Sequence, residues 1–283
     1  MGIKEFGWED ELITALSTIG AETEYLPSAR YRLLKFKNSD QLIIHLLSIY
    51  NQFPPDEVVA LGRNHDEQSV QVIHLWEDIW RTRSAQVLSR ITSILGKNKT
   101  IHGRKTKIVE VTQLVADEFY NSYHLQGPAG CKYRYALLNE GSIIAIAGFS
   151  DKRRMTRQPG EYSSVELIRF ATVNGITVTG GLSKLIRHFI KVVQPNDVMS
   201  YADLDWSRGK GYLKLGFKQV AVLPPMEIFL NLHTLERCFL QRMPREIKAG
   251  IIALQDSERD VYLKKLNYIP IYNTGNLKYI LYL

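Results

Sequence analysis

The chain has 283 residues and a net charge of +7, and 45% of its residues are hydrophobic and 23% charged. This composition is typical of a globular protein with one large or two small domains, and no apolar run is long enough to span a bilayer. The N-terminal sequence has no signal-peptide core, so we expect a cytoplasmic protein with no membrane partner. Two cysteines, Cys131 and Cys238, exclude a disulfide framework and a cysteine zinc site.

The first part of the chain, residues 1–100, is predicted to be an N-terminal α/β domain. Apolar spacing predicts a helix over 8–22 and alternation predicts a strand over 31–38. Residues 39–53 are expected to form a helix with Ser39 or Asp40 as N-cap, ended by the two prolines that follow. A strand runs into a helix over 69–80, and the helix continues to a stop at Gly96. The basic segment 98–107 is the expected domain boundary.

Residues 101–283 are predicted to be a second α/β domain with a C-terminal extension. A strand at 107–111 precedes a helix at 112–124, capped by Thr112. Residues 131–150 read as two strands joined at Asn139-Glu140-Gly141. A strand at 162–173, a glycine loop and a helix follow, and then a strand, a short helix and a strand. The expected order is β-α-β-β-β-α-β-α-β.

Three segments of the second part resemble the GNAT acyltransferase superfamily. The strand "VELIRFATV" leads into "GGLSKLI", which resembles the coenzyme A pyrophosphate motif of that family, and "YLKLGF" resembles the end of a family helix. The paired strands of residues 132–150 stand where the family places its central hairpin. The resemblance covers residues 107–223 and implies a mixed central sheet with flanking helices.

The same resemblance implies acetyl-CoA or another acyl-CoA as co-substrate, without a metal. The loop departs from the usual family pattern, because the aligned positions are Thr177, Gly180 and Leu182. Backbone amides at a helix N-terminus still bind phosphates well, so we expect the pyrophosphate there. The predicted coenzyme-binding residues are Thr177, Thr179, Gly180, Gly181, Leu182, Ser183, Lys184 and Ser207.

A longer resemblance covers residues 70–283. Strings such as "HLWEDIW", "ELIRFATV" and "SYADLDWSRGKGYLKLGF" are similar to a phage-type group related to the Mom-like DNA-modification acyltransferases. In that group the GNAT-like part is often joined to the remains of a very-short-patch-repair-like nuclease. "VIHLWEDIW" resembles the last strand and helix of that nuclease, and Glu77 and Asp78 are then relics of its site.

Candidate catalytic residues are Glu166, Tyr201, Asp203, Tyr212 and His124. Alternation along the strands places Tyr201, Asp203 and Asp205 on one face, and Leu167 with Arg169 on the face opposite Glu166. Either Glu166 or Asp203 could remove the proton of an amine. The resemblance implies that Tyr212 protonates the leaving thiolate and that the two strands splay around the acyl group. His124, in a glycine-proline loop, could bind or deprotonate the substrate.

The positive charge is unevenly placed. Eight basic residues and one acidic residue lie between Arg81 and Glu110, and the run Asp151–Arg157 adds more. Such clustering is typical of contact with a nucleic acid backbone, although a basic patch near a coenzyme phosphate would look similar. Both runs are expected to form one surface for DNA or RNA, and Trp206 could stack on a base. The candidate nucleic-acid residues are Arg81, Arg83, Arg104, Lys105, Lys107, Arg153 and Arg154.

The sequence therefore predicts an acyl-CoA-dependent N-acyltransferase whose acceptor is a nucleobase or another nucleic-acid-linked amine. Direct transfer is expected, because neither cysteine falls on the matched motifs as a nucleophile. His74, His102 and His188 lack metal-like spacing, so no metal is expected. The alternative is a non-catalytic nucleic-acid-binding protein of phage or mobile-element origin that keeps these folds as scaffolds.

Overall fold

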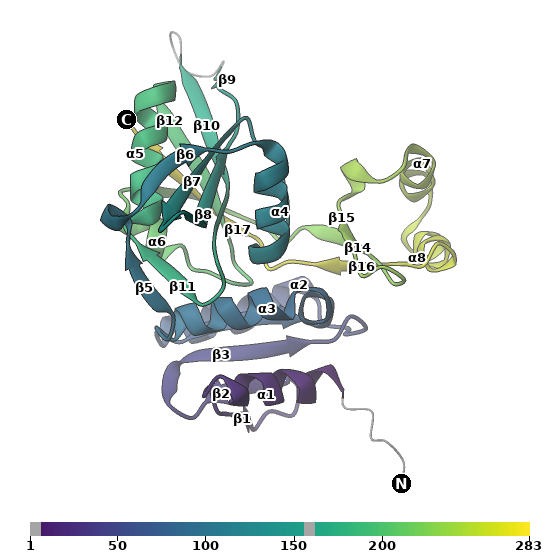
Figure 1. Cartoon of the computed structure of the whole chain (residues 1–283). Coiled ribbons are helices and arrows are strands. Elements are labelled where there is room, and N and C mark those ends of the chain that lie inside the picture. Colours follow the sequence, from purple (N-terminus) through teal and green to yellow (C-terminus); the bar gives the residue numbers. More distant parts are fainter. Residues whose placement is uncertain (1–6, 156–161) are drawn as a thin grey trace.

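Two β-sheets, with helices between and around them, make up most of this computed structural model, which describes residues 7–155 and 162–283 (Figure 1). The smaller sheet belongs to the N-terminal part of the chain, and the larger sheet carries the segments that resemble an acyltransferase. The predicted class, a mixed α/β sheet with flanking helices, is confirmed. Within the described ranges no helix is long and apolar enough to cross a membrane.

The N-terminal layer is a four-stranded sheet in the order β1-β2-β3-β4. Its first three strands are antiparallel neighbours, and β3 pairs in parallel with β4. Apolar side chains of the sheet and of helices α1 and α3 form one core, which also takes in Trp206 from far along the chain. The elements are α1 (Trp8–Thr18), β1 (Thr23–Leu26), β2 (Leu33–Phe36), β3 (Ser39–Leu47), α2 (Pro55–Glu67), β4 (Gln71–Trp76) and α3 (Glu77–Ile94).

The helix predicted over residues 39–53 is wrong, because this segment contains strand β3. Residues Leu42–Leu47 are all buried, since β3 lies between two other strands and is covered on both faces. A strand buried on both faces shows no alternation, so its apolar run cannot be told from a buried helix by periodicity. The two prolines do not end a helix; Pro55 instead stands at the first position of α2, where proline is well tolerated.

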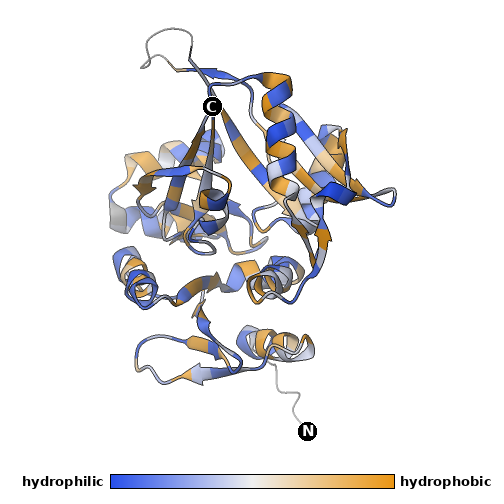
Figure 2. Ribbon diagram, turned by 90° about the vertical axis from the view of Figure 1, so that its left-hand side faces the viewer, coloured by the Kyte–Doolittle hydropathy of each residue, from blue (hydrophilic) through white to orange (hydrophobic). Residues whose placement is uncertain are grey.

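The central sheet has the strand order β13-β17-β12-β10-β8-β7-β6, with β9 paired to the start of β10. Helix α5 packs on one face with a large apolar core, and α4 packs on the other. Figure 2 shows these strands as largely hydrophobic. The elements are β6 (Lys107–Glu110), α4 (Gln113–Tyr123), β7 (Tyr133–Asn139), β8 (Ser142–Phe149), β9 (Arg153–Arg154), β10 (Ser163–Thr172), α5 (Gly181–Val193), β12 (Asp197–Asp203), α6 (Lys210–Lys214), β13 (Lys218–Leu223) and β17 (Asn276–Tyr282).

Several local predictions in this part are confirmed. The Thr112 hydroxyl accepts a hydrogen bond from Val115 N at 3.3 Å and caps α4. Glu140 and Gly141 both have positive φ, as a tight two-residue turn between β7 and β8 requires. The segment predicted as a basic connector is more ordered than expected, because β5 (Lys99–His102) pairs in parallel with β11 (Ile176–Thr179) of the glycine loop.

The C-terminal extension divides into two parts. Its last strand, β17, lies inside the central sheet between β12 and β13. The residues between β13 and β17 form a small layer of three strands and two helices, which stands apart on the right of Figure 1. Its elements are β14 (Glu227–Asn231), β15 (Arg237–Cys238), the 3-10 turn η2 (Leu240–Arg242), α7 (Arg245–Ala253), α8 (Asp256–Lys265) and β16 (Tyr268–Tyr272).

Candidate functional site

Strands β10 and β12 are joined at one end only. They pair in parallel through three residues of each strand, from Ser164–Asp197 to Glu166–Met199. Beyond Glu166, strand β10 continues to pair with β8, and β12 continues to pair with β17 as far as Asp203. The two strands therefore separate in the middle of the sheet, as the sequence resemblance implied.

A β-bulge on β10 lies where the strands separate. Leu167 is opposite Phe149 and Arg169 is opposite Gly148, so Ile168 is an extra residue. Successive residues of a strand face opposite sides of the sheet, and residues paired across two strands face the same side. Phe149 and Gly148 are successive residues of β8, so their partners Leu167 and Arg169 face opposite sides of the sheet. The sequence-based prediction that these two residues share a face is wrong, and Arg169 lies on the same face as Glu166.

The hydroxyl of Tyr212 lies at the point of separation. Ser200 Oγ is 3.0 Å from the carbonyl oxygen of Leu167 and 2.9 Å from Tyr212 Oη. A serine hydroxyl carries one proton, so when it donates to the carbonyl, the tyrosine is left as the donor toward the serine. Burial raises the pKa of Tyr212. The phenol therefore remains protonated at neutral pH, and rotation of its hydroxyl can direct its single proton from Ser200 Oγ to another acceptor.

Helix α5 begins directly after the predicted glycine loop. Its N-cap, Gly180, has φ +72°, and no side chain caps the helix. The intrahelical bonds start with Lys184 N donating to Gly180 O, which leaves the three preceding amides directed out of the helix end. Ser183 is half-buried in this first turn, while Leu182 packs partly against the core. An uncapped helix start of this kind favours negative charge.

The other predicted coenzyme residues are already engaged or lie beside the loop. Lys184 Nζ donates to Gly103 O at 3.0 Å and also to Thr106 O, so it ties α5 to the 3-10 turn η1 (Gly103–Lys105). Gly103 lies against the cap, since a Cβ there would be 3.1 Å from Gly181 N. Thr177 and Thr179 flank the buried Val178 on β11.

Glu166, Tyr201 and Asp203 lie on the α4 face of the sheet. The side chain of Glu166 is 21% exposed, and its nearest cationic partner is Arg153 Nη2 at 3.9 Å. Asp203 is more constrained, because its carboxylate accepts hydrogen bonds from Gln126 Nε2 at 3.1 Å and from Asp205 N at 3.0 Å. Burial raises the pKa of Asp203 and also that of Tyr201. Three of the predicted catalytic residues therefore share one face of the sheet.

His124 follows α4 and lies in the loop that reaches Asp203. Its Nδ1 accepts a hydrogen bond from Gln126 N at 3.1 Å, which assigns the proton of the neutral ring to Nε2. Burial, followed by the positive charges of Arg169, Arg90 and Arg83, lowers the pKa of His124 to about 3. The imidazole is thus neutral at pH 7 and acts as a donor rather than as an effective base.

Helix α3 of the N-terminal layer lies beside the site, which the sequence analysis did not foresee (Figure 1). Arg83 Nη1 and Gln86 Nε2 both donate to Asn121 O in the last turn of α4. Ser89 Oγ accepts from Gly175 N, just beyond the end of β10, at 3.2 Å. Arg83 has non-helical angles (φ −141°, ψ 30°), so α3 bends at this contact. The helix therefore runs past the open end of the separated strands.

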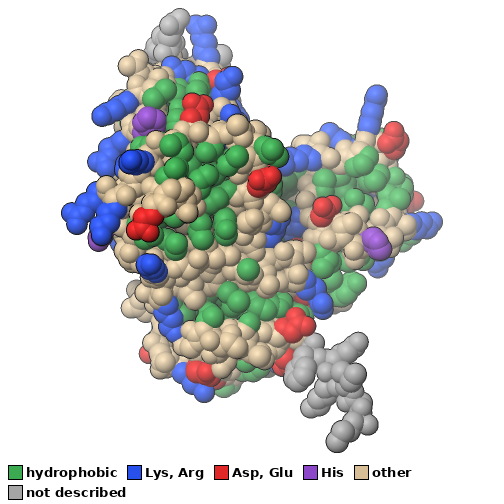
Figure 3. Space-filling view, in the orientation of Figure 1, with side chains coloured by type: hydrophobic (Ala, Val, Ile, Leu, Met, Phe, Trp, Pro, Cys, Tyr) green, Lys and Arg blue, Asp and Glu red, His purple; other side chains and the backbone are tan. Residues whose placement is uncertain are grey.

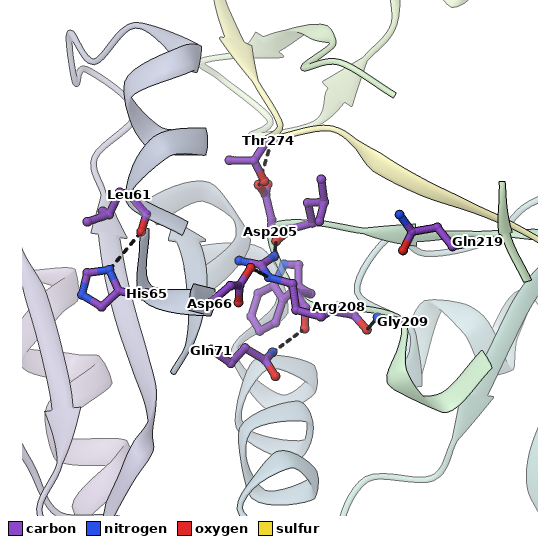
Figure 4. Close-up of polar contacts among 12 residues, drawn as sticks. Leu61, His65, Asp66, Gln71, Asp205, Arg208, Gly209, Gln219 and Thr274 are labelled. Carbon is purple, nitrogen blue, oxygen red and sulfur yellow. Dashed lines mark hydrogen bonds and ion pairs between the residues drawn. The ribbon is translucent and has the colours of Figure 1, made fainter. Parts of the chain in front are cut away.

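The loop after β12 joins the two sheets (Figure 4). Arg208 forms an ion pair with Asp66 of α2, and Gln71 Nε2 donates to Trp206 O at 3.1 Å. Asp205 is buried, its carboxylate accepts from Thr274 N and Oγ1, and its carbonyl accepts from His74 N. Burial and the adjacent Asp203 carboxylate raise the pKa of Asp205 to about 7.

This loop corrects two predictions. Asp205 does not continue the Tyr201–Asp203 face, because β12 ends at Asp203 and the chain turns. Trp206 is 8% exposed and belongs to the N-terminal core, so it cannot stack on a base. Ser207 Oγ accepts from Gly209 N within the same loop. Because these residues serve the contact between layers, sequence alternation alone could not place them.

The predicted nucleic-acid residues do not form one cluster. Arg81 pairs with Glu77, and Arg83 holds the end of α4. Arg104, Lys105 and Lys107 are exposed beyond the C-terminal end of β10. Figure 3 shows Lys and Arg side chains gathered on the left side of the molecule. Arg153 and Arg154 pair with the other end of β10, roughly 30 Å away at about 3.3 Å per residue. Arg157, in the second run, lies outside the described residues.

The proposed nuclease relics have structural partners. Glu77 accepts from Ser48 Oγ at 3.1 Å and pairs with Arg81, while Asp78 is held by Arg237. Within residues 7–155 and 162–283 no cluster of three or more His, Cys, Asp or Glu side chains could hold a metal ion. Burial raises the pKa of Cys131 to about 11, so this thiol stays protonated.

Comparison with solved structures finds acetyltransferases at low similarity. A GNAT family acetyltransferase from Elizabethkingia anophelis with acetyl-CoA bound is 15% identical, with a TM-score of 0.34, over 63% of this chain and 99% of that chain. Arabidopsis thaliana Naa50 in complex with a bisubstrate analogue is 10% identical, with a TM-score of 0.38 and the same coverage. A Bacillus subtilis acetyltransferase in complex with CoA is 14% identical, with a TM-score of 0.33, again over 63% and 99%. No family model and no curated protein sequence matches the chain.

Proposed function

We propose that this protein is an acyl-CoA-dependent N-acyltransferase. The observation that carries the proposal is the separation of β10 from β12 beside the uncapped start of α5. The gap between two separated strands exposes backbone groups that can hold an extended acyl thioester, and the helix start can bind its pyrophosphate. The Tyr212 hydroxyl lies at the same point of separation. One short region of the sheet thus carries the groups that the reaction needs.

The chemistry follows from these positions. The acceptor amine attacks the thioester carbonyl carbon, a carboxylate removes the amine proton, and the C–S bond breaks as Tyr212 protonates the sulfur. We assign the base to Glu166, because among the described residues its carboxylate accepts no hydrogen bond and lies 3.9 Å from its only ion-pair partner. Both oxygens of Asp203 already accept bonds, so Asp203 positions the 124–127 loop. General acid–base catalysis of this kind contributes about 10²–10⁴ in rate.

The decisive experiment places a negative charge at the start of α5. Ser183→Asp favours the helix through its dipole but repels a phosphate, whereas Ser183→Ala changes no charge. We expect calorimetry to detect acetyl-CoA binding to the native protein and to Ser183→Ala, and at least tenfold weaker binding to Ser183→Asp at an unchanged melting temperature. Absence of acetyl-CoA binding to the native protein would refute the proposed function.

We also propose that the acceptor is linked to a nucleic acid, as the charge distribution suggests. The exposed cations Lys99, Arg104, Lys105 and Lys107 support this link, because no ion pair neutralises them among the described residues. The turn η1, which holds Arg104 and Lys105, lies against the start of α5. Binding through phosphates should weaken steeply with salt. An electrophoretic titration with DNA and RNA tests this; charge reversal of Arg104 and Lys105 should abolish binding. Undiminished binding by that variant would contradict the proposal.

A further inference from the structure

We propose that the acceptor amine carries a carboxylate or phosphate group, and that Arg90 and Arg169 bind this group. The inference rests on the proposed acyl transfer, which it deepens by naming the chemistry of the acceptor. It also gives the N-terminal layer a part in the site, because Arg90 belongs to α3 and Arg169 belongs to β10.

Arg90 is directed toward the site by the geometry of α3. Gln86 contacts Asn121 O at the end of α4, and Arg90 follows four residues later, so both lie on the same face of the helix. The adjacent Ser89 contacts Gly175 beyond the end of β10. The guanidinium of Arg90 is close enough to both His124 and Tyr212 to lower the pKa of each. Arg90 therefore lies on the side of α3 that faces the end of α4 and the loop beyond β10.

Arg169 approaches the same place from the sheet. The bulge at Ile168 puts it on the α4 face, where Nε donates to Gly127 O at 3.1 Å and Nη1 donates to Ile168 O at 3.0 Å. Gly127 is also adjacent to Arg83, since a Cβ on Gly127 would be 3.1 Å from Arg83 Nη2. Two arginines thus meet at one glycine, and Arg90 is near the histidine of the same loop.

The cluster of Arg83, Arg90 and Arg169 has no neutralising carboxylate within ion-pair distance among the described residues. The Arg90 guanidinium makes neither a hydrogen bond nor an ion pair with the described residues, although the residue is half-buried. Half-buried guanidinium groups normally have partners, because desolvating a charge is costly. A bound anion would supply the missing partner for Arg90 and for the free Nη2 of Arg169.

The position of the cluster selects the kind of anion. Arg90 belongs to α3 and Arg169 to β10, and both approach the loop after α4, which suits a single anionic group on the acceptor. The guanidinium fork matches both carboxylate and phosphate oxygens. The neutral Nε2–H of His124 adds a third donor. Because the cluster is on the Glu166 face, an acceptor anchored here presents its amine to the proposed base.

The test uses inorganic phosphate as the probe, without acyl-CoA, on the full chain. We expect phosphate to raise the melting temperature and to shift the His124 imidazole resonance, with its pKa rising toward 6.5 as the nearby positive charge is neutralised. Arg90→Gln should weaken phosphate binding roughly 10- to 100-fold, as expected for loss of a charge-assisted hydrogen bond. Arg187→Gln, an exposed substitution on α5, is the matched control and should bind as the native protein does.

The variant Ser183→Asp separates this site from the start of α5. Phosphate binding that survives Ser183→Asp but is lost in Arg90→Gln supports the arginine cluster. The reverse pattern places the anion at α5 and overturns the inference, as does a His124 resonance that ignores phosphate. Acetyl-CoA binding should be unchanged in Arg90→Gln; its loss would assign Arg90 to the coenzyme and overturn the acceptor assignment.

Discussion

The ion pair between Asp78 and Arg237 predicts a strongly non-additive effect on stability. Asp78, in the first turn of α3, has a side chain that is 1% exposed, and Arg237 of β15 holds it through two hydrogen bonds of 2.6 and 2.9 Å. Arg237→Met removes the cation but keeps an apolar stem, and so leaves a carboxylate buried without its partner. Breaking a buried pair from one side costs about 3–5 kcal/mol.

Removing both charges should cost much less. The double variant Asp78→Leu with Arg237→Met removes both partners of the pair. The remaining loss is then about 0.3–1 kcal/mol for an acidic residue at a helix start, plus small packing terms and the weaker attraction of Arg237 for Asp203 and Asp205. Urea unfolding followed by circular dichroism measures both free energies of unfolding. The exposed pair Lys35–Glu24 is the control, and Lys35→Met should leave the free energy of unfolding nearly unchanged, because water screens this pair. A double variant no more stable than Arg237→Met would refute this reasoning.

Three further predictions concern the site and its supports. Tyr212→Phe and Glu166→Gln should each lower turnover by about 10²–10⁴-fold, with the affinity for acetyl-CoA nearly unchanged. Asp203→Asn should instead mainly raise the KM for the acceptor, and steady-state kinetics distinguishes the two effects. Burial lowers the pKa of His45 from its ordinary 6.5 to about 4. Between pH 6.5 and 4 the unfolded state therefore binds a proton that the folded state does not, and the free energy of unfolding falls as the pH drops. His45→Asn should make this fall less steep in urea titrations at several pH values. Gly209 has φ +65° and no room for a Cβ beside the Tyr279 ring, so Gly209→Ala should lower the melting temperature. Gly211, where a Cβ would point into open space, is the control, and Gly211→Ala should not lower the melting temperature.

The sequence predicted the central strands and helices well because most carry a clear period or cap. The glycine turn between β7 and β8 and the Thr112 cap are such local signals. Residues 39–47 lacked such a signal, because a strand covered on both faces reads as a continuous apolar run.

The site could be predicted only in part. Glu166, Tyr201, Asp203 and Tyr212 were accessible from the motif and its strands. The bulge at Ile168, which reverses the face of Arg169, depends on pairing with β8 and leaves no mark in a single sequence. The approach of Arg90 depends on how α3 packs against α4, far along the chain. The clustering of positive charge along the sequence predicted instead that the basic residues of this helix contact a nucleic acid.

The insertion of β17 between β12 and β13 has a consequence for the order of folding. Its pairing with β12 joins Asn276 to Asp203 across more than seventy residues, a separation that slows folding when the intervening chain is disordered. The intervening layer removes most of this distance, because Glu227 pairs with Tyr272 and so its two ends meet. Closing a loop of about fifty residues in advance reduces the entropy lost when β17 docks. The small C-terminal layer, once formed, thus shortens the loop that β17 must close, and the packing of Tyr212 on Tyr279 depends on that docking.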